Sequence, residues 1–353
     1  MEQISKLVRN NRVLLIYTGG TIGMGINPRT KALEPLDFNH LLQNIPEIKL
    51  LSTQIDVYQF AQPIDSSDMT PAFWVQLVDI IAARYAQYDG FIILHGTDTM
   101  AYTASALSFM LENLTKPVIL TGSQLPIGQL RTDGRENLIS SIELATLHHA
   151  DNSPMVPEVC IYFNGRLLRG NRSTKQNADG FNAFDSFNYP HLGEAGITFQ
   201  FSPYHILKPD YQRPMVPHTQ LNQNVMVLSL FPGVQPPIFQ HVLDTPELKG
   251  VVMRTYGSGN APQQPWLIDI LKRATQRGVT IVNISQCVAG AVAMERYDTG
   301  FQLKETGIIS GGDSTVEAAV TKLMVLYGQH TDVATIRAKL CQSLAGEITL
   351  ETA

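Results

Sequence analysis

"LLIYTGGTIGMG", residues 14–25, changes from an apolar run to two glycines that threonines flank. The apolar part belongs to a β-strand candidate at 13–17, and Gly19 and Gly20 end it. Glycines at such a turn let a small molecule approach the backbone and leave amide groups free to stabilise an oxyanion. Thr18 and Thr21 therefore have two interpretations: both cap a tight turn, or Thr21 is a nucleophile beside those amides.

Other apolar runs repeat this pattern along the chain, at 91–95, 117–121, 159–163, 225–231, 250–256 and 279–285. They are near-continuous rather than alternating, which is typical of strands buried on both faces of a parallel sheet. Segments with helical periodicity lie between them, at 70–86, 99–114, 134–148, 265–277, 314–327 and 333–345. The alternation predicts an α/β fold, and Ser67 or Asp68 is the expected cap of the first helix.

The length of 353 residues favours two domains, because single cores stop growing near ~250–300 residues. The boundary is expected at 201–224, a largely polar stretch with four prolines ahead of a new strand. The sequence thus predicts a larger α/β domain over 1–200, a linker over 201–224 and a smaller α/β domain over 225–353. The larger domain is expected to hold a mainly parallel sheet flanked by helices.

Composition and charge exclude several classes of protein. The 26 basic and 31 acidic residues give a net charge of -5 without a basic block, so no nucleic-acid partner is expected. Cys160, Cys287 and Cys341 are far apart and no CxxC or HExxH spacing occurs, so neither a disulfide framework nor a metal site is expected. Without a signal peptide or a ~20-residue apolar span, we expect a cytoplasmic protein with no membrane partner.

Polar loops follow the first four strand candidates: "TGGTIGMG", "HGTDTM" (95–100), "TGSQLP" (121–126) and "NGRLLRGNRSTK" (164–175). Ligands of open α/β sheets bind at the carboxyl ends of the strands, so these loops are expected to meet at one edge. The glycine loop has neither the GxxxxGK[ST] nor the GxGxxG spacing of nucleotide sites. All four loops carry hydroxyls, and the set contains one Asp–Lys combination.

Each charged residue of these loops has a structural as well as a functional interpretation. His95 in a strand is more typical of a hydrogen-bonded core histidine than of a catalyst. Asp98 either caps the helix that begins near Thr99 or pairs with a cation. Lys175 is either solvated or, buried beside Asp98, a base that acts on Thr97. In "DSSDM", Asp65, Ser66 and Ser67 are either caps or ligands for a molecule with an ammonium and a carboxylate.

Several of these segments occur in a fixed order: "YTGGTIGM", "DSSDMTP", "HGTDTMAYTASALSFMLENL", "KPVILTGSQ" and "RGNRSTKQNADGF". "RTYGSGNAP" (254–262) and "GGDSTVEAAVTKL" (311–323) extend the pattern over nearly the whole chain. With these motifs the sequence resembles the bacterial-type L-asparaginases, specifically their cytoplasmic type I branch. The resemblance implies two α/β domains, with the catalytic loops on the larger N-terminal one.

The resemblance also implies a reaction: hydrolysis of the side-chain amide of L-asparagine to L-aspartate and ammonia, without metal or cofactor. By this resemblance Thr21, rather than Thr18, attacks the amide carbon and forms an acyl-enzyme. Thr97, Asp98 and Lys175 correspond to a second catalytic group, in which Lys175 polarises Thr97 and helps to activate water.

Substrate and subunit contacts are implied in the same way. Asp65 and Ser66, with Ser67 nearby, fall where the family binds the α-amino and α-carboxylate groups of the substrate. Members of the family form homodimers that usually join as homotetramers, with sites bordered by the partner subunit. Asn260 of "YGSGN" is a candidate cross-subunit residue, and a turn asparagine is the equal alternative.

The sequence departs from the family in one respect. Relatives often carry a tyrosine close to the nucleophile in the loop after the first motif, whereas residues 25–38 contain none and Tyr17 precedes Thr18. The group that takes the proton from Thr21 is therefore open. Gly23 and Gly25 favour a hinge for a loop that excludes water.

Three alternatives to the asparaginase function are compatible with the same pocket. One is an amidase that acts on L-glutamine; another acts on a tRNA-linked amide, as in archaeal amidotransferase subunits, which carry an added N-terminal domain before the motif that contains Thr21 here. A non-catalytic amino-acid-binding regulator would keep the pocket and lose the hydroxyls. Thr21, Thr97 and Lys175 are all present, which favours the enzyme.

Overall fold

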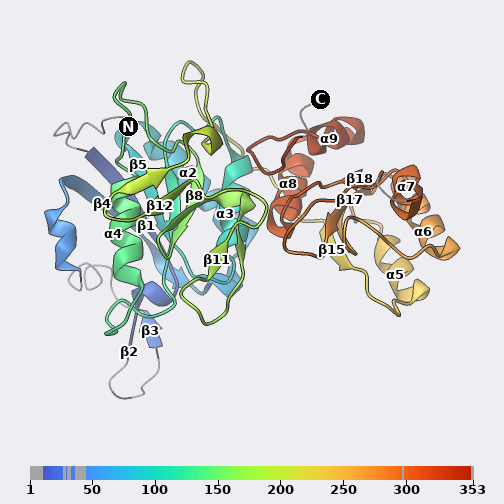
Figure 1. Cartoon of the computed structure of the whole chain (residues 1–353), viewed down its shortest axis with the longest axis horizontal. Coiled ribbons are helices and arrows are strands. Elements are labelled where there is room, and N and C mark those ends of the chain that lie inside the picture. Colours follow the sequence, from blue (N-terminus) through green and yellow to red (C-terminus); the bar gives the residue numbers. More distant parts are fainter. Residues whose placement is uncertain (1–10, 27–28, 30–32, 36–44, 296–297, 351–353) are drawn as a thin grey trace. The chain divides into compact units, whose positions relative to one another are not determined.

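The computed structural model describes residues 11–26, 29, 33–35, 45–295 and 298–350. The chain forms two compact units, each treated separately below. The first comprises Met1–Ser186 and Pro190–Pro217, and the second comprises Phe187–Tyr189 and His218–Ala353 (Figure 1).

An eight-stranded sheet is the centre of the first unit, in the order β13-β12-β9-β8-β7-β5-β1-β4. Its parallel strands are β4 (Thr53–Ile64), β1 (Asn11–Gly19), β5 (Gly90–Leu94), β7 (Val118–Thr121) and β8 (Val159–Phe163). Its antiparallel strands are β9 (Arg166–Arg169), β12 (Gly193–Ala195) and β13 (Phe199–Phe201). The parallel half confirms the predicted sheet, and β5, β7 and β8 are buried along their whole length.

Three α-helices are described in the first unit: α2 (Pro71–Arg84), α3 (Met100–Met110) and α4 (Gly134–Leu144). Helix α3 packs on α2 and against β7 and β8, and α4 packs against the same two strands. In Figure 1, α3 and α4 lie on opposite sides of these strands, which explains why β7 and β8 have no exposed residue.

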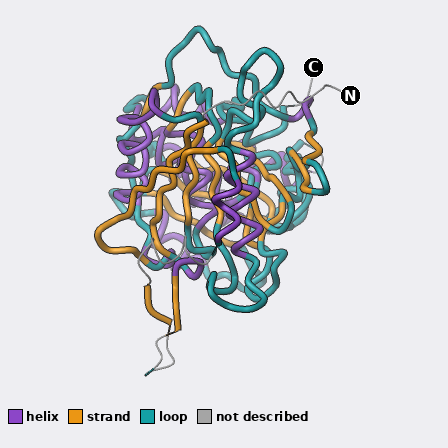
Figure 2. Tube along the Cα trace, turned by 90° about the vertical axis from the view of Figure 1, so that its left-hand side faces the viewer, coloured by secondary structure: helices purple, strands orange, loops and turns teal. Residues whose placement is uncertain are grey.

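Short elements complete this unit. The 3-10 turns are η1 (Thr21–Gly23), η2 (Pro46–Leu50), η3 (Ser66–Asp68), η4 (Tyr85–Gln87), η5 (Gly170–Arg172) and η6 (Pro203–His205). The small strands are β2 (Met24–Ile26) with β3 (Leu33–Pro35), β10 (Thr174–Lys175) with β11 (Phe184–Asp185), and β6 (Leu111–Glu112) with β14 (Val216–Pro217). The β2–β3 hairpin projects from the unit in both Figure 1 and Figure 2. The expected hinged loop at 25–38 lies partly outside the described residues.

The second unit has a parallel sheet of four strands: β15 (Val225–Ser229), β16 (Gly250–Thr255), β17 (Thr280–Ser285) and β18 (Ile309–Ser310). Its helices are α5 (Pro236–Leu243), α6 (Pro265–Gln276), α7 (Asp298–Glu305), α8 (Val316–Gln329) and α9 (Val333–Leu340). Val251 and Val252, adjacent on β16, belong to two separate core clusters, one with α5 and α6 and one with α8 and α9. The smaller sheet therefore has a core on both faces.

A buried ion pair anchors the last described residues to this unit. Lys322 on α8 contacts Glu347 at 2.6 Å between Nζ and Oε1, and both side chains are almost fully buried. Lys322 Nζ also donates to the carbonyl of Gln342 at 2.6 Å, while Glu347 accepts from the amides of Leu344 and Ala345. Burial lowers the pKa of Lys322, and Glu347 opposes that shift.

The stretch 201–224 is divided between the two units, because the first unit ends at Pro217 and the second resumes at His218. The Asn113 side chain donates to the carbonyls of Asp210 and Arg213, at 3.0 and 2.8 Å. The Asn222 amide donates to the carbonyl of Met324 on α8 at 2.9 Å. The domain boundaries expected from sequence stay a prediction, and the first part of the expected linker is hydrogen-bonded to the first unit.

One local prediction is wrong, and one strand was missed. The N-cap of α2 is Thr70 rather than Ser67 or Asp68, because those two residues form the separate turn η3. The twelve-residue strand β4 was not predicted, since it lies at the sheet edge and its exposed and half-buried side chains hide the apolar signal. Among the described helices, none is long and apolar enough to cross a membrane.

Candidate active site

The two glycines after β1 are required by backbone geometry. Gly19 has a φ of 131° and Gly20 a φ of 87°, both in the region that favours glycine. A Cβ at Gly20 would lie 2.5 Å from the Cα of Gly96, and one at Gly19 would collide with the carbonyl of Ile64. The glycine loop therefore packs directly on the backbone at the end of β4 and on the backbone that follows β5.

The two threonines differ in what their hydroxyls contact. Thr18 is buried and donates to the Leu94 carbonyl at 2.9 Å, so its hydroxyl holds β1 against β5. Thr21 begins η1 and is half-buried. Over the part of the chain that the structure describes, its hydroxyl has no hydrogen-bond partner. Of the two, only Thr21 has a hydroxyl available to a ligand.

Lys175 lies beside the loop that follows β5. Its Nζ donates to Thr97 Oγ1 at 2.9 Å and to Asp98 Oδ1 at 2.6 Å. The lysine side chain is 19% exposed, so the solvated interpretation is wrong, and the strand pairing of β10 with β11 fixes its backbone. The capping interpretation of Asp98 is wrong as well, because Thr99 is the N-cap of α3 and no side chain caps it.

Thr97 also contacts a residue that the sequence analysis did not single out. Its hydroxyl donates to Gln124 Oε1 at 3.2 Å, and Gln124 lies just after β7. The available signal was position alone, because Gln124 belongs to "TGSQLP", one of the four polar loops expected at this edge. The loops after β5 and β7 therefore do meet, as the parallel strands require.

In "DSSDM" the structure shows the capping role for Asp65, while the ligand-binding role of Asp65, Ser66 and Ser67 stays a prediction. Asp65 is the N-cap of η3, where its Oδ1 accepts from the amide and the hydroxyl of Ser67, each at 2.9 Å. These hydrogen bonds lower the pKa of Asp65, so it is a carboxylate at neutral pH. The buried Ser66 hydroxyl accepts from the Asp98 amide at 3.3 Å. Turn η3 therefore lies against the loop that carries Thr97.

Family models match both parts of the chain. The family model "Asparaginase, N-terminal" matches residues 12–205, and "Glutaminase/Asparaginase C-terminal domain" matches residues 224–340. The chain belongs to the asparaginase family. The family's two models thus cover both α/β units.

Individual relatives show how close the similarity is. L-asparaginase 1 of Escherichia coli strain K12 is 42% identical over 97% of this chain and 99% of its own length. The mouse (Mus musculus) 60 kDa lysophospholipase is 41% identical over 96% of this chain, which spans 63% of that protein. The crystal structure of L-asparaginase I from Vibrio cholerae matches with a TM-score of 0.87 and 42% identity, over 97% of this chain and 100% of that one.

Within this asparaginase fold, His95 has a structural role. It is buried, with Nδ1 at 2.6 Å from the Gly96 carbonyl and Nε2 at 2.9 Å from Thr103 Oγ1. A carbonyl can only accept, so Nδ1 carries the proton and Thr103 donates to Nε2. Burial lowers the pKa of His95 to about 4. The interpretation of His95 as a hydrogen-bonded core histidine is confirmed.

Tyr17 lies under the turn that begins with Thr21. A Cβ at Gly23 would collide with its phenol oxygen, so Gly23 is needed where η1 crosses the ring. Burial raises the pKa of Tyr17 to about 12. The phenol therefore keeps its proton at neutral pH, which argues against Tyr17 as the resting base for Thr21.

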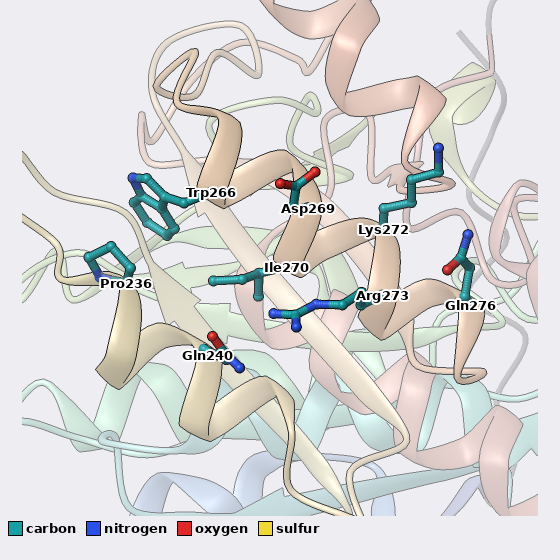
Figure 3. A pocket seen from close by; sticks show the side chains of 8 residues that line it. All are labelled: Pro236, Gln240, Trp266, Asp269, Ile270, Lys272, Arg273 and Gln276. Carbon is teal, nitrogen blue, oxygen red and sulfur yellow. The ribbon is translucent and has the colours of Figure 1, made fainter.

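The cross-subunit role expected of Asn260 stays a prediction. Asn260 belongs to the second unit, where its backbone pairs with Tyr256, amide to carbonyl at 2.8 and 2.9 Å. That unit also has a hollow of about 540 Å³ between α5 and α6, and its lining is drawn in Figure 3. Trp266 and Ile270 contribute apolar surface there, and Asp269 and Arg273 contribute charges. None of the expected site residues lines this hollow.

Proposed function

We propose that the protein is an L-asparaginase, which hydrolyses the side-chain amide of L-asparagine to L-aspartate and ammonia. The observation that carries the proposal is the Lys175–Thr97–Asp98 cluster, at the same sheet edge as the glycine loop with Thr21. Membership of the asparaginase family and the names of the relatives support it. The chemistry we propose uses protein groups and water, without a metal or cofactor.

The proposed reaction has two steps. Thr21 Oγ1 bonds to the amide carbon and gives up its proton, the C–N bond breaks, and the nitrogen takes up one proton and leaves as ammonia. Water then adds to the aspartyl ester on Thr21, and aspartate leaves as the threonine oxygen recovers its proton. Lys175 polarises Thr97, which places and activates that water, and Asp98 keeps the lysine oriented.

The substrate is proposed to bind through its amino-acid end. The Asp65 carboxylate accepts from the α-ammonium group, because Ser67 holds Oδ1 while Oδ2 has no hydrogen-bond partner among the described residues. Ser66 and Ser67 provide hydroxyl groups for the α-carboxylate. In this proposed binding mode the side-chain amide of the substrate points toward Thr21 and Thr97.

We propose a homodimer or homotetramer as the active species, with Asn260 as a cross-subunit residue. Cys160, Cys287 and Cys341 are free thiols, two of them exposed, which supports a reducing cytoplasmic location. Light scattering of the purified protein tests the assembly. If an Asn260→Ala variant keeps its assembly and its KM for asparagine, Asn260 has no cross-subunit role.

Ammonia release tests the proposed activity directly. We expect faster release from L-asparagine than from L-glutamine, with little from the D-forms and no effect of a chelator. One extra methylene in a pocket changes specificity by about 10- to 200-fold. A clear preference for glutamine, or activity that disappears with the chelator and returns with a metal, would contradict the proposal.

Covalent trapping tests the roles of the two threonines. Thr21→Ala should abolish both turnover and covalent labelling by the substrate. Thr97→Val keeps the volume but removes the hydroxyl, so deacylation should slow and an aspartyl ester should accumulate on Thr21. Acid quench and mass spectrometry of the peptide over 13–29 detect it, whereas an adduct within 91–103 would reverse the roles. No adduct in either variant, despite an ammonia burst in the parent, would favour direct attack by water.

A further inference from the structure

Gln124 connects the Lys175 cluster to the chain segment that follows Lys175. Its Oε1 accepts from Thr97 at 3.2 Å, while its Nε2 donates to the carbonyls of Ala178 at 3.0 Å and Gly180 at 3.1 Å. One half-buried amide thus contacts a proposed catalytic hydroxyl and, on its other side, the backbone of a turn.

The orientation of this amide follows from its partners. The carbonyl oxygens of Ala178 and Gly180 can only accept hydrogen bonds, so the NH₂ group of Gln124 must face them. Its oxygen then faces Thr97. Because that oxygen can only accept, Thr97 has to donate its single proton to Gln124.

This assignment leaves the lone pairs of Thr97 Oγ1 for other groups. One accepts from Lys175 Nζ at 2.9 Å, and the other is available to a ligand or a water molecule. Without Gln124 the hydroxyl could rotate and point its proton at that ligand instead. The direction of a single O–H bond therefore depends on Gln124.

The backbone of Gln124 is held in place separately. Asp133 accepts from its amide through Oδ1 and Oδ2, at 3.1 and 3.0 Å, and from the Leu125 amide at 3.1 Å. A side-chain substitution at Gln124 therefore leaves these anchoring bonds intact, which makes the residue suitable for mutation.

We propose that Gln124 is a positioning residue for the reaction: it holds the Thr97 proton away from the reacting atoms and keeps the Thr97 oxygen directed at Lys175 and at water. This inference rests on the proposed amidohydrolase function and adds a residue to it. Gln124 acts through Thr97 and needs no contact with the substrate.

Gln124→Met tests the inference, since methionine keeps the length of the side chain and removes all three hydrogen bonds. We expect kcat for ammonia release to fall by about 10- to 100-fold with an unchanged KM, because one catalytic group loses its orientation. Gln176→Met is the matched control: it removes an exposed hydrogen bond from Gln176 to the Asn182 carbonyl, 3.1 Å long, and should retain the parental kcat. Equal kcat values for the two variants would overturn the inference.

A double-mutant cycle separates orientation from support of the turn. In a Thr97→Val background there is no hydroxyl to orient, so Gln124→Met should have almost no further effect on kcat. If the fold-loss in kcat of the double variant equals the product of the two single fold-losses, so that their free energies are additive, Gln124 only supports the turn at 178–180. That result would overturn the inference. Thermal unfolding checks each variant, and Gln124→Ala replaces the methionine variant if that one does not fold. A parent protein without ammonia release would refute the proposed function itself, whereas an active parent with additive variants refutes only the role of Gln124.

Discussion

At the scale of single residues, the candidate site contains one lysine whose side chain has only two hydrogen-bond partners among the described residues. Lys175 contacts one hydroxyl and one carboxylate, and Asp98 is 63% exposed although it is paired. An exposed carboxylate that loses its partner is solvated by water at little cost. The pair should therefore matter far more for activity than for stability.

Lys175→Met tests this difference. We expect the variant to fold with a change in unfolding free energy below about 1 kcal/mol, because Asp98 can turn to solvent. We expect kcat to fall by about 100- to 10,000-fold, because Thr97 loses its activating partner. Ammonia release and urea unfolding measure the two quantities.

Lys116→Met provides the control for Lys175. Lys116 donates to the carbonyls of Tyr85 and Tyr88, both at 2.6 Å, near the start of β7 and away from the catalytic loops. Its removal should leave kcat unchanged. Near-normal turnover of the Lys175 variant would show that the second catalytic group is misassigned.

His95 predicts a pH dependence of stability. Its pKa is about 4 in the folded protein and about 6.5 in an unfolded chain. Between these values the unfolded chain binds a proton that the folded protein does not, so the unfolding free energy decreases as the pH falls from about 6.5 to about 4. The loss approaches about 1.4 kcal/mol per pH unit, or about 3 kcal/mol over the window.

Urea unfolding at several pH values checks this prediction. His95→Gln should lose stability less steeply than the parent as the pH falls through that window. His241→Gln, which changes an exposed histidine of α5, should keep the parental slope. Equal slopes for all three proteins would contradict the assignment of a buried neutral His95.

The sequence predicted which loops of the candidate site lie together, because strand ends are easy to locate. Residues just after parallel strands meet at one edge, so strand positions alone group Thr21 with Thr97, and the family motif adds Ser66. Gln124 could not be singled out, because its role depends on an amide orientation set by two carbonyls distant in sequence. Sequence patterns carry no information about the direction of a hydrogen bond.

At the scale of elements, three loops pack so closely that some of their glycines cannot be replaced by a larger residue. Gly20 rests on Gly96, and a Cβ at Gly96 would lie 2.5 Å from Ser66 Oγ. The loops after β1, β5 and β4 therefore contact one another at positions where only glycine fits. Displacement of one loop would move the others.

Gly20→Ala should test this packing against Gly165→Ala. Both glycines have a positive φ, of 87° and 76°, but a Cβ at Gly165 meets nothing within 4 Å. Both variants therefore carry the backbone strain, and only Gly20→Ala adds a steric clash. We expect Gly20→Ala to be about 1–3 kcal/mol less stable than Gly165→Ala and to lose ammonia release. Similar stability of the two variants, measured by urea unfolding, would refute the packing argument.

Buried strands were the elements that the sequence predicted best. β5, β7 and β8 are apolar over their full length because both faces are covered. The edge strand β4 has no such run, and the short strands β12 and β13 are defined by pairing rather than by composition. Helix α3 ends at Met110 rather than 114, because the chain enters the small strand β6 at Leu111.

At the scale of the whole molecule, we propose that the second unit can fold independently as a domain. Its sheet has a core on both faces, and residues 224–340 match a family model of their own. Residues 218–353 expressed alone should show α/β circular dichroism and a cooperative urea transition. They should release no ammonia, because the proposed catalytic residues lie in the first unit. A non-cooperative or aggregated fragment would contradict this domain assignment.

The pairing of Lys322 with Glu347 restricts how the C-terminal end of such a fragment can be engineered. A shortened chain that stops before Glu347 would leave a buried ammonium group with only backbone carbonyls around it. Loss of one partner of a buried ion pair costs about 3–5 kcal/mol, a large share of the stability of a typical domain. Purification tags and fusion partners therefore belong after residue 349, where the Thr349 amide makes the last described hydrogen bond, to Asp313 at 2.8 Å.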